Sequence, residues 1–180
     1  MTDTRSWSAG TWWIAGGVAG LVLTLDQVSK SLVVLARPSG GDGVVSVRLV
    51  RNTGASFGIG AGHPDIVVLV SVVIIAIVVA LLARTRGKAM TACLALVLGG
   101  AVSNLADRLV RGPGLGQGGV IDWIHVWGYP ATFNLADVAI RVGAVGAAAL
   151  ALGIQRLSVH GVRVQRLRAH WPLRSCRAAR

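Results

Sequence analysis

Four long runs of apolar residues dominate this chain and restrict what it can fold into. The clearest run, 66–83, contains no charged residue, and 89–109 is rich in Ala, Leu and Gly. Runs 12–36 and 134–154 are of similar length but contain charged side chains. A helix needs ~20 apolar residues to cross the hydrocarbon core of a bilayer. The sequence therefore predicts an all-α membrane protein with four transmembrane helices.

The composition excludes several classes of protein. Apolar residues make up 53% of the chain and charged residues only 14%, against about 25% charged residues in an average soluble domain. All seven acidic residues are Asp, which excludes sites that need Glu, such as the H-E-x-x-H helix of zinc proteases. The four His lack the spacing of metal ligands, and Cys93 and Cys176 form no disulfide framework. We expect neither a metal nor another cofactor.

The distribution of basic residues predicts the orientation in the membrane. Four spans place both termini on one side, together with Arg84, Arg86 and Lys88 in the second loop and seven Arg in the C-terminal tail. Because basic residues concentrate on the cytoplasmic side, we predict that both termini are inside and that loops 37–65 and 110–133 are outside. A cleaved signal peptide is a weaker interpretation of the first run, which is too long and contains oppositely charged residues.

The chain divides into a four-span membrane domain, 1–155, and a basic cytoplasmic tail, 156–180. Such a tail suits the anionic headgroups of membrane lipids. Nucleic-acid binding is the alternative for a charge of this sign, but the positive-inside rule explains the charge without that partner. We therefore expect contact with membrane lipids and no nucleic-acid partner.

The two outer loops contain structure of their own. Residues 44–51 are β-branched and alternate in part between apolar and polar, which predicts a short strand. Residues 120–127 are apolar and aromatic around a single Asp. Trp123, Trp127 and Tyr129 suit the level of the lipid headgroups.

Polar side chains inside the spans need a reason, because a charge at membrane depth costs ~2.5–3.5 kcal/mol on insertion scales. Asp26 and Lys30 lie four residues apart on one face of the first helix. They form either an internal ion pair that supports the helix, which we favour, or a polar patch that faces a site. Asn104 and Asp107 share a face near the end of the third helix, where they either anchor the helix end or belong to a site.

Three further polar residues lie near the same outer boundary. Asn134 suits the N-cap of the fourth helix, and Asp137 lies in its first turn, where the helix dipole favours a negative charge. Capping alone is thus an alternative to a role in a site. Asp122 has no cation beside it and has apolar neighbours. Desolvation would raise the pKa of such a carboxyl, unless it belongs to a strand and points to water.

The gathering of aspartates at one boundary indicates acid–base chemistry. Two carboxyls held close together share a proton, and the pKa of one of them rises. The ionised carboxyl accepts a proton from water and the protonated one donates to a carbonyl oxygen, which together hydrolyse an amide. A serine mechanism has little support, because Ser29 and Ser103 have no suitable base beside them and no G-x-S-x-G motif is present.

Two non-enzymatic classes remain as alternatives. A transporter or channel also uses charged residues within its spans, but places them near the midplane on discontinuous helices. A membrane scaffold has no need of three aspartates at the outer boundary.

Five motifs together resemble those of the lipoprotein signal peptidases (signal peptidase II), a family of bacterial aspartyl membrane proteases. In the family's order they are D-Q-V-S-K at 26–30, R-N-T-G-A-S-F-G at 51–58, G-G-A-V-S-N-L-A-D-R at 99–108, V-I-D-W at 120–123 and F-N-L-A-D at 133–137. The resemblance implies that Asp122 and Asp137 form the catalytic dyad. It also implies a set of substrate-binding or site-shaping residues: Asp26, Lys30, Asn52, Gly54, Asn104, Asp107, Arg108 and Asn134.

Asp107 is a further aspartate considered for catalysis, but the charge of the adjacent Arg108 favours its ionised form, and we prefer Asp122. The family's outer parts are a small β-sheet cradle and a short interfacial helix, which we expect near 59–65 or 110–117. The implied substrate is a prolipoprotein whose cysteine carries diacylglycerol, cleaved just before that cysteine at the outer face of the bacterial cytoplasmic membrane. We expect Asp137 to activate water, Asp122 to supply a proton to the carbonyl or the leaving nitrogen, and the protein to act as a monomer.

Overall fold

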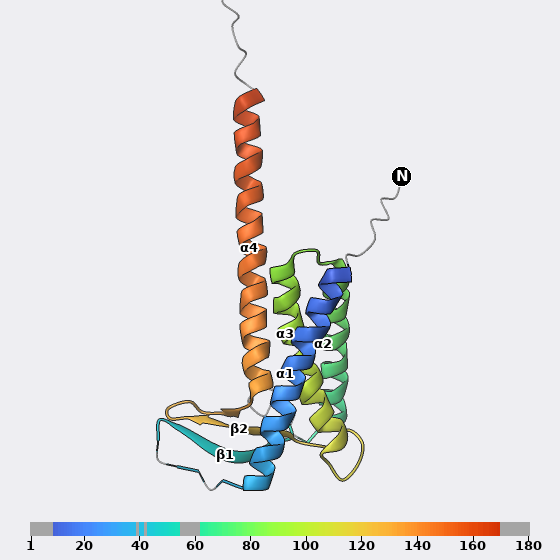
Figure 1. The fold of residues 1–180 in the computed structure, drawn as a ribbon, viewed down its shortest axis with the longest axis vertical. Helices are drawn as coiled ribbons and strands as arrows, with labels where there is room; N and C mark the ends of the chain where they lie inside the picture. Colours follow the sequence, from blue (N-terminus) through green and yellow to red (C-terminus); the bar gives the residue numbers. More distant parts are fainter. Residues whose placement is uncertain (1–8, 39, 42, 55–61, 170–180) are drawn as a thin grey trace, which may run out of the picture.

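The computed structural model describes residues 9–38, 40–41, 43–54 and 62–169. Within these residues lie four long helices, α1 (Ala9–Ala36), α2 (Pro64–Arg84), α3 (Lys88–Val110) and α4 (Leu135–Ala169). They also contain an antiparallel sheet of β1 (Val45–Asn52), β2 (Val120–Val126) and β3 (Thr132–Phe133), in that order. Figure 1 shows the sheet at one end of the helices, and the start of α1 and the α2–α3 connection at the other. The predicted four-helix membrane fold with a small sheet is confirmed.

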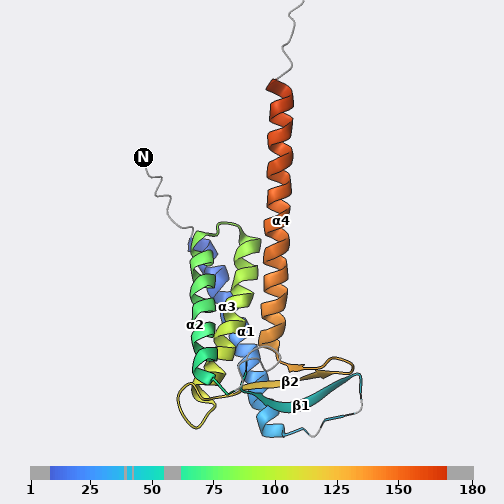
Figure 2. The same ribbon diagram turned by 180° about the vertical axis from the view of Figure 1, so that it is seen from behind.

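Helix α3 is the centre of the bundle. It packs against α1, α2 and α4, and Figures 1 and 2 show α2 and α4 on opposite sides of it. Glycines allow the backbones to approach closely. A Cβ atom on Gly143 of α4 would lie 2.4 Å from the carbonyl oxygen of Cys93, and one on Gly100 of α3 would lie 2.5 Å from that of Ala136. Small residues at such contacts are the usual means by which helices pack in membranes.

The outer surfaces of the helices suit a lipid environment. Four segments are long and apolar enough to cross a bilayer, namely Thr11–Ala36, Pro64–Arg84, Lys88–Val110 and Leu135–Gly153. Large aliphatic side chains are exposed along these spans, most densely on α2. Helices satisfy their own backbone hydrogen bonds, so apolar side chains facing hydrocarbon complete a stable transmembrane segment. The fold is therefore that of a multi-pass membrane protein.

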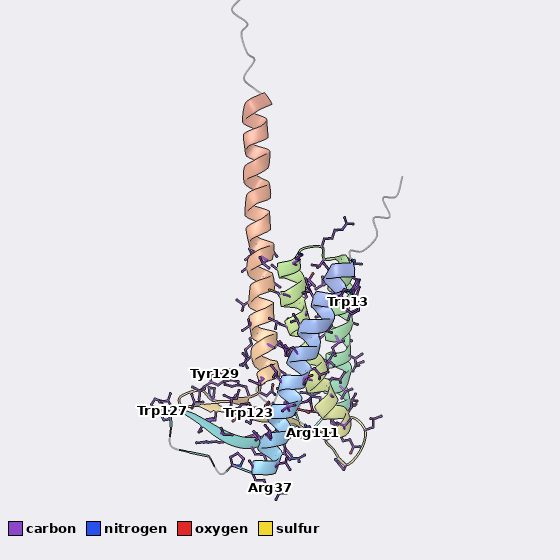
Figure 3. The ribbon with its side chains drawn as sticks, in the orientation of Figure 1. Trp13, Arg37, Arg111, Trp123, Trp127 and Tyr129 are labelled. Carbon is purple, nitrogen blue, oxygen red and sulfur yellow. The ribbon has the colours of Figure 1, made fainter. Side chains whose placement is uncertain are left out.

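Aromatic side chains lie near both ends of the spans. Figure 3 shows Trp13 at the start of α1, and Trp123, Trp127 and Tyr129 near the sheet at the opposite end. Trp13 and Trp127 are strongly exposed. Tryptophan and tyrosine are enriched at both membrane–water interfaces. Their positions therefore fit one boundary near Trp13 and a second boundary at the level of the sheet.

The sheet joins two loops that are distant in the sequence. The strand predicted over 44–51 is confirmed as β1, and it pairs with β2 so that Asn52 lies opposite Val120 and Val50 opposite Asp122. The register shifts between Val47 and Val50. Such bulges redirect side chains locally and are frequent next to active sites. The register brings the end of β1 beside the aspartate of β2.

The structure changes two details of the sequence prediction. Helix α4 continues to Ala169 rather than ending near 154, because no proline interrupts the chain before Pro172. Residues 170–180 of the predicted tail lie outside the described residues. The short helix expected near 110–117 is not there, since the Gly- and Pro-containing residues 111–116 form bends and a turn. Its other expected position, 59–65, lies partly outside the described residues.

We predict that Gly143→Ala lowers the stability of the bundle. The added methyl group meets the backbone of Cys93, and overpacking of this kind costs roughly 1–3 kcal/mol. Gly20→Ala is the matched control, because nothing lies within 4 Å of a Cβ atom there. Thermal unfolding of both variants in one detergent should give a lower midpoint for Gly143→Ala alone. Equal midpoints would contradict the close contact of α3 with α4.

Candidate active site

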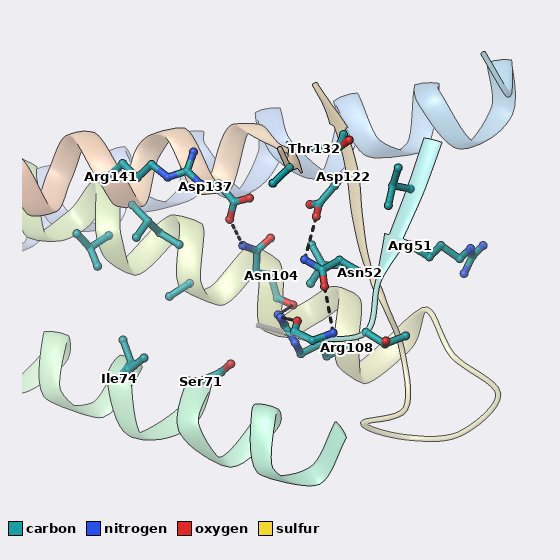
Figure 4. A pocket seen from close by; sticks show the side chains of 18 of the residues that line it. Arg51, Asn52, Ser71, Ile74, Asn104, Arg108, Asp122, Thr132, Asp137 and Arg141 are labelled. Atoms are coloured by element: carbon teal, nitrogen blue, oxygen red, sulfur yellow. Dashed lines mark hydrogen bonds between the residues drawn. The ribbon is translucent and has the colours of Figure 1, made fainter. Parts of the chain in front are cut away.

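A cavity of about 820 Å³ opens where the sheet meets the helices. Its wall comes from β1 and β2 on the sheet side, from α2, α3 and α4 on the membrane side, and from the segment between β2 and β3. Six of the predicted site residues line it: Asn52, Gly54, Asn104, Arg108, Asp122 and Asp137. Figure 4 shows the carboxyl groups of Asp122 and Asp137 directed into this space from β2 and α4. The other four predicted site residues do not line the cavity but lie behind its wall: Asp26, Lys30, Asp107 and Asn134.

Asp122 is held by amides in a buried position on β2. Its side chain accepts hydrogen bonds from Nδ2 of Asn134 at 2.7 Å and from Nδ2 of Asn52 at 3.1 Å, and the residue is 2% exposed. Burial raises its pKa to about 6, and the negative charge of Asp137 acts in the same direction. The two amides and the charge of Lys30 lower it to a smaller extent. Asp122 is thus a strand residue, but it faces the cavity wall and not bulk water, and the predicted rise of its pKa is confirmed.

Asp137 lies in the first turn of α4, as predicted. Its backbone N–H donates to Oδ1 of Asn134 at 2.9 Å, which is the hydrogen bond of an N-cap. Its Oδ1 accepts from Nδ2 of Asn104 at 3.0 Å. Asn134 contacts both aspartates, because its Nδ2 also donates to Asp122.

Behind the cavity, a buried ammonium group joins α1 to α3. Lys30 is 0% exposed, and its Nζ donates to Oδ2 of Asp26, to Oδ2 of Asp107 at 2.8 Å and to Oδ1 of Asn104 at 2.9 Å. All three N–H donors therefore have an acceptor. A buried charge is tolerated only when it is paired and fully hydrogen-bonded. The predicted internal ion pair is present, and it extends to a second carboxylate.

The two carboxylate partners of Lys30, Asp107 and Asp26, hold the backbone just before each cavity aspartate. Oδ2 of Asp107 accepts from the N–H of Ile121 at 3.2 Å, one residue before Asp122. Oδ1 of Asp26 accepts from the N–H of Ala136 at 2.9 Å, one residue before Asp137. Neither carboxylate lines the cavity. Asp26, Lys30 and Asp107 therefore position the site from behind.

Arg108 fixes the end of β1 against α3. Its guanidinium donates to the carbonyl oxygens of Gly54 at 2.8 Å and Asn104 at 3.0 Å. Oδ1 of Asn52 accepts from the N–H of Gly54 at 3.0 Å, which turns the chain after the strand. Nε of Arg108 is buried and has no partner among the described atoms.

Four polar residues near the site were not among the predicted site residues: Gln27, Ser103, Arg111 and Arg141. Gln27 donates to Oδ1 of Asp107 at 2.9 Å, and Nε of Arg111 donates to the same oxygen at 2.7 Å. Oγ of Ser103 donates to Asp26 at 2.7 Å. The i,i+4 spacing of Asp107 and Arg111 was the available signal. Arg141 lines the cavity and stacks on Phe133, with its Cζ 5.4 Å from the ring centroid. The sequence feature that could have identified Arg141 is its position as a single arginine within the apolar run 134–154.

Comparison with known proteins gives a family match over most of the chain. The model of the family described as signal peptidase (SPase) II matches residues 18–153. A lipoprotein signal peptidase of Leifsonia xyli subsp. xyli is 41% identical over 138 residues, covering 74% of this chain and 64% of that protein. A lipoprotein signal peptidase of Rhodococcus jostii is 41% identical over 134 residues, covering 71% and 67%. The match thus spans about two thirds of the length of these relatives.

Two solved structures share the fold. One, a bacterial membrane enzyme at 2.3 Å resolution, has a TM-score of 0.70 at 23% identity and covers 82% of this chain and 90% of its own. The second, also a bacterial membrane enzyme, at 1.9 Å resolution, has a TM-score of 0.67 at 24% identity and covers 81% and 94%. Four helices with a small sheet at one end are therefore an arrangement already seen in bacterial membranes.

We predict that Lys30→Met strongly destabilises the protein. The substitution leaves the carboxylates of Asp26 and Asp107 buried without their shared cation, and breaking a buried ion pair costs roughly 3–5 kcal/mol. Lys88→Met is the control, because Lys88 is exposed at the start of α3. Thermal unfolding of the purified variants measures the difference. A Lys30→Met midpoint equal to that of Lys88→Met would refute the role of Lys30.

We predict that Asp137→Asn lowers the pKa of Asp122 from about 6, since the charge of Asp137 raises it. The pKa should stay above 3.8, the ordinary value of an aspartate, because burial is the larger cause. The pH dependence of the carboxyl ¹³C chemical shift measures it, with Asp122→Asn to assign the signal. Asp65→Asn, at the exposed start of α2, should leave the pKa unchanged. An unchanged value in Asp137→Asn would show that the two carboxyls do not interact.

Proposed function

This chain belongs to the signal peptidase II family, and from that premise we propose that it is an aspartic endopeptidase of lipid-modified prolipoproteins. The bond cleaved is the peptide bond just before the lipidated cysteine. The observation that carries the proposal is the pair of carboxyls that enter one cavity from separate elements, with the pKa of Asp122 raised by burial and by the charge of Asp137. Such a pair is suited to hold one shared proton.

The proposed reaction uses the two aspartates in opposite protonation states. Ionised Asp137 takes a proton from a water molecule as the water oxygen attacks the scissile carbonyl carbon. Protonated Asp122 gives its proton to the carbonyl oxygen. In the second step the C–N bond breaks, the leaving nitrogen takes the proton from Asp137, and a hydroxyl of the intermediate returns a proton to Asp122. Both carboxyls end in their starting states.

The surrounding amides support this division of roles. Asn104 donates to Asp137, and the N-terminus of α4 adds a favourable dipole for its negative charge. Burial of Asp122 on β2 favours its protonated form. The unpartnered Nε of Arg108 is the donor that we assign to a backbone carbonyl of the substrate, which would hold the peptide against the end of β1.

The shape of the cavity supports a lipid-modified substrate. The sheet side of the cavity presents polar residues such as Asn52 and Thr53. Its membrane side presents one apolar residue from each of three helices: Ile74 (α2), Val97 (α3) and Ile140 (α4). We assign the peptide to the polar side and the acyl chains to the apolar side, where the cavity lies between α2 and α4. The substrate would then enter from the bilayer without leaving it.

We propose that the sheet and the cavity lie at the outer face of the bacterial cytoplasmic membrane. Arg84, Arg86 and Lys88 lie at the other end of the bundle, beside the start of α1, and clustered basic residues favour the cytoplasm. Both termini would therefore be cytoplasmic.

Hydroxyl groups near the cavity do not favour a serine nucleophile. Oγ of Ser71, which lines the cavity, donates to the carbonyl of Val67 in its own helix at 2.8 Å. Oγ of Ser103 lies behind the wall and donates to Asp26. Neither hydroxyl faces a neutral base, which a serine nucleophile needs.

We predict that Asp122→Asn and Asp137→Asn each abolish cleavage, with a loss of at least roughly a hundredfold to ten-thousandfold, because each removes one partner of the proton transfers. The assay incubates the detergent-purified protein with a diacylglyceryl-modified precursor and follows the shortened product. Asp65→Asn is the control and should cleave normally. Thermal unfolding confirms that the variants remain folded. Near-normal turnover in Asp122→Asn would refute the dyad, and ion flux without a shortened product would indicate a channel instead.

A further inference from the structure

The sheet end of the molecule carries three arginines, Arg37, Arg48 and Arg51, of which Arg51 also lines the catalytic cavity. Arg37 follows the last residue of α1, and the other two lie on β1. Figure 3 shows Arg37 at this end of the bundle, opposite Trp13. Under the positive-inside rule the cytoplasmic end should collect the basic residues. A group of arginines at the other end therefore needs a separate explanation.

Two of these arginines line a small cleft of about 340 Å³ between the end of α1 and β1. Its lining is Val34, Arg37, Pro38, Leu49 and Arg51. Among the residues that the structure describes, no acidic side chain lines this cleft, and none forms an ion pair with either arginine. Arg37 and Arg51 thus line one small space in which no carboxylate of the described residues neutralises them, and Nη1 of Arg51 donates to the carbonyl oxygen of Arg111 at 3.3 Å.

The backbone at Arg37 adds a second, independent observation. Its φ is +46°, and it is the one non-glycine residue with positive φ in the described part of the chain. Its N–H donates to the carbonyl of Val33 at 3.0 Å, which ends α1. Glycine is the residue that such a helix end favours, and other side chains are strained there. A ligand-binding role of the guanidinium would explain why an arginine occupies a position that favours glycine.

The surface of α1 next to the cleft is apolar. Leu32 and Leu35, in the last turns before the cleft, are 61% and 80% exposed, and they belong to a membrane span. Hydrocarbon chains can therefore lie along α1 directly beside the arginines. The combination of an exposed aliphatic face and a cationic cleft at the span's end matches the two parts of an anionic phospholipid.

We propose that this cleft binds the phosphate of an anionic phospholipid in the leaflet on the sheet side. Arg37 and Arg51 would donate to the phosphate oxygens, for which the planar guanidinium is well shaped, and the acyl chains would lie against Leu32 and Leu35. A zwitterionic lipid should bind less well, because the positively charged amine of its headgroup is repelled by the guanidinium groups. Arg51 also lines the catalytic cavity, so the lipid sits beside the active site. The proposal does not depend on peptidase activity.

The test titrates the detergent-purified full chain with dioctanoyl phosphatidylglycerol and measures Kd. Dioctanoyl phosphatidylcholine and inorganic phosphate are titrated in parallel. We expect saturable binding of phosphatidylglycerol, at least roughly fivefold weaker binding of phosphatidylcholine, and no competition by inorganic phosphate. Arg37→Gln should weaken phosphatidylglycerol binding by roughly fivefold, the usual contribution of one basic residue near an anionic lipid. Arg86→Gln, exposed at the opposite end, is the matched control and should bind as the wild type does.

A second variant separates binding from folding. Arg37→Gly removes the guanidinium but suits the positive φ, so its thermal midpoint without lipid should equal or exceed that of the wild type. The increase of the midpoint on adding phosphatidylglycerol should nevertheless be smaller than in the wild type. The proposal is overturned if phosphatidylcholine binds equally well, if both Arg37 variants bind like the wild type, or if Arg86→Gln loses as much affinity as Arg37→Gln. Competition by inorganic phosphate at equal affinity would overturn the lipid as the ligand.

Discussion

The buried ammonium group of Lys30 is the constraint on which the rest of the site depends. Its side chain is 0% exposed, so its charge has to be met by neighbouring polar groups. Asp26 and Asp107 provide two carboxylates and Asn104 a carbonyl oxygen. One cation for two anions leaves an excess of negative charge, which Arg111 reduces by its ion pair with Asp107. These groups fix α1 and α3 in one relative position, because any sliding of the helices would unpair a buried charge.

The same ion cluster also fixes the two cavity aspartates, Asp122 and Asp137, through backbone amides. The second oxygen of Asp26 holds the start of α4, and an oxygen of Asp107 holds the start of β2. Each amide precedes one of the two cavity aspartates, so a helix and a strand that are separate in the fold meet with a set geometry. Their environments then differ. Asp122 sits in a buried strand and its pKa is raised to about 6, whereas Asp137 sits at a helix N-terminus, which stabilises a negative charge.

The sequence predicted the parts of this structure that depend on local patterns. The spans followed from apolar runs, β1 from its β-branched alternation, and the cap of α4 from Asn134 beside an apolar helix. The cross-chain contacts were not predictable in this way. Asn52 reaches Asp122 only because of the register of β1 on β2, which includes a bulge, and no local pattern specifies that register. The hydrogen bonds of Lys30 to α3 likewise depend on how two helices pack. The five motifs supplied by resemblance what local physics could not.

The position of the carboxyls at the end of the spans reconciles two opposing requirements. Hydrolysis of an amide needs water and an ionised group, and a charge deep in hydrocarbon is costly. An acylated substrate, in contrast, is held in the hydrocarbon. In the function that we propose, a cavity whose wall is sheet on one side and membrane helix on the other would satisfy both, because water and peptide would lie at the polar side and the lipid at the apolar side. The side-chain amides of Asn52, Asn104 and Asn134 donate to the two carboxyls there. The small sheet would thus be part of the proposed chemistry, since without β1 and β2 Asp122 and its amide donor Asn52 would be absent from this end of the spans.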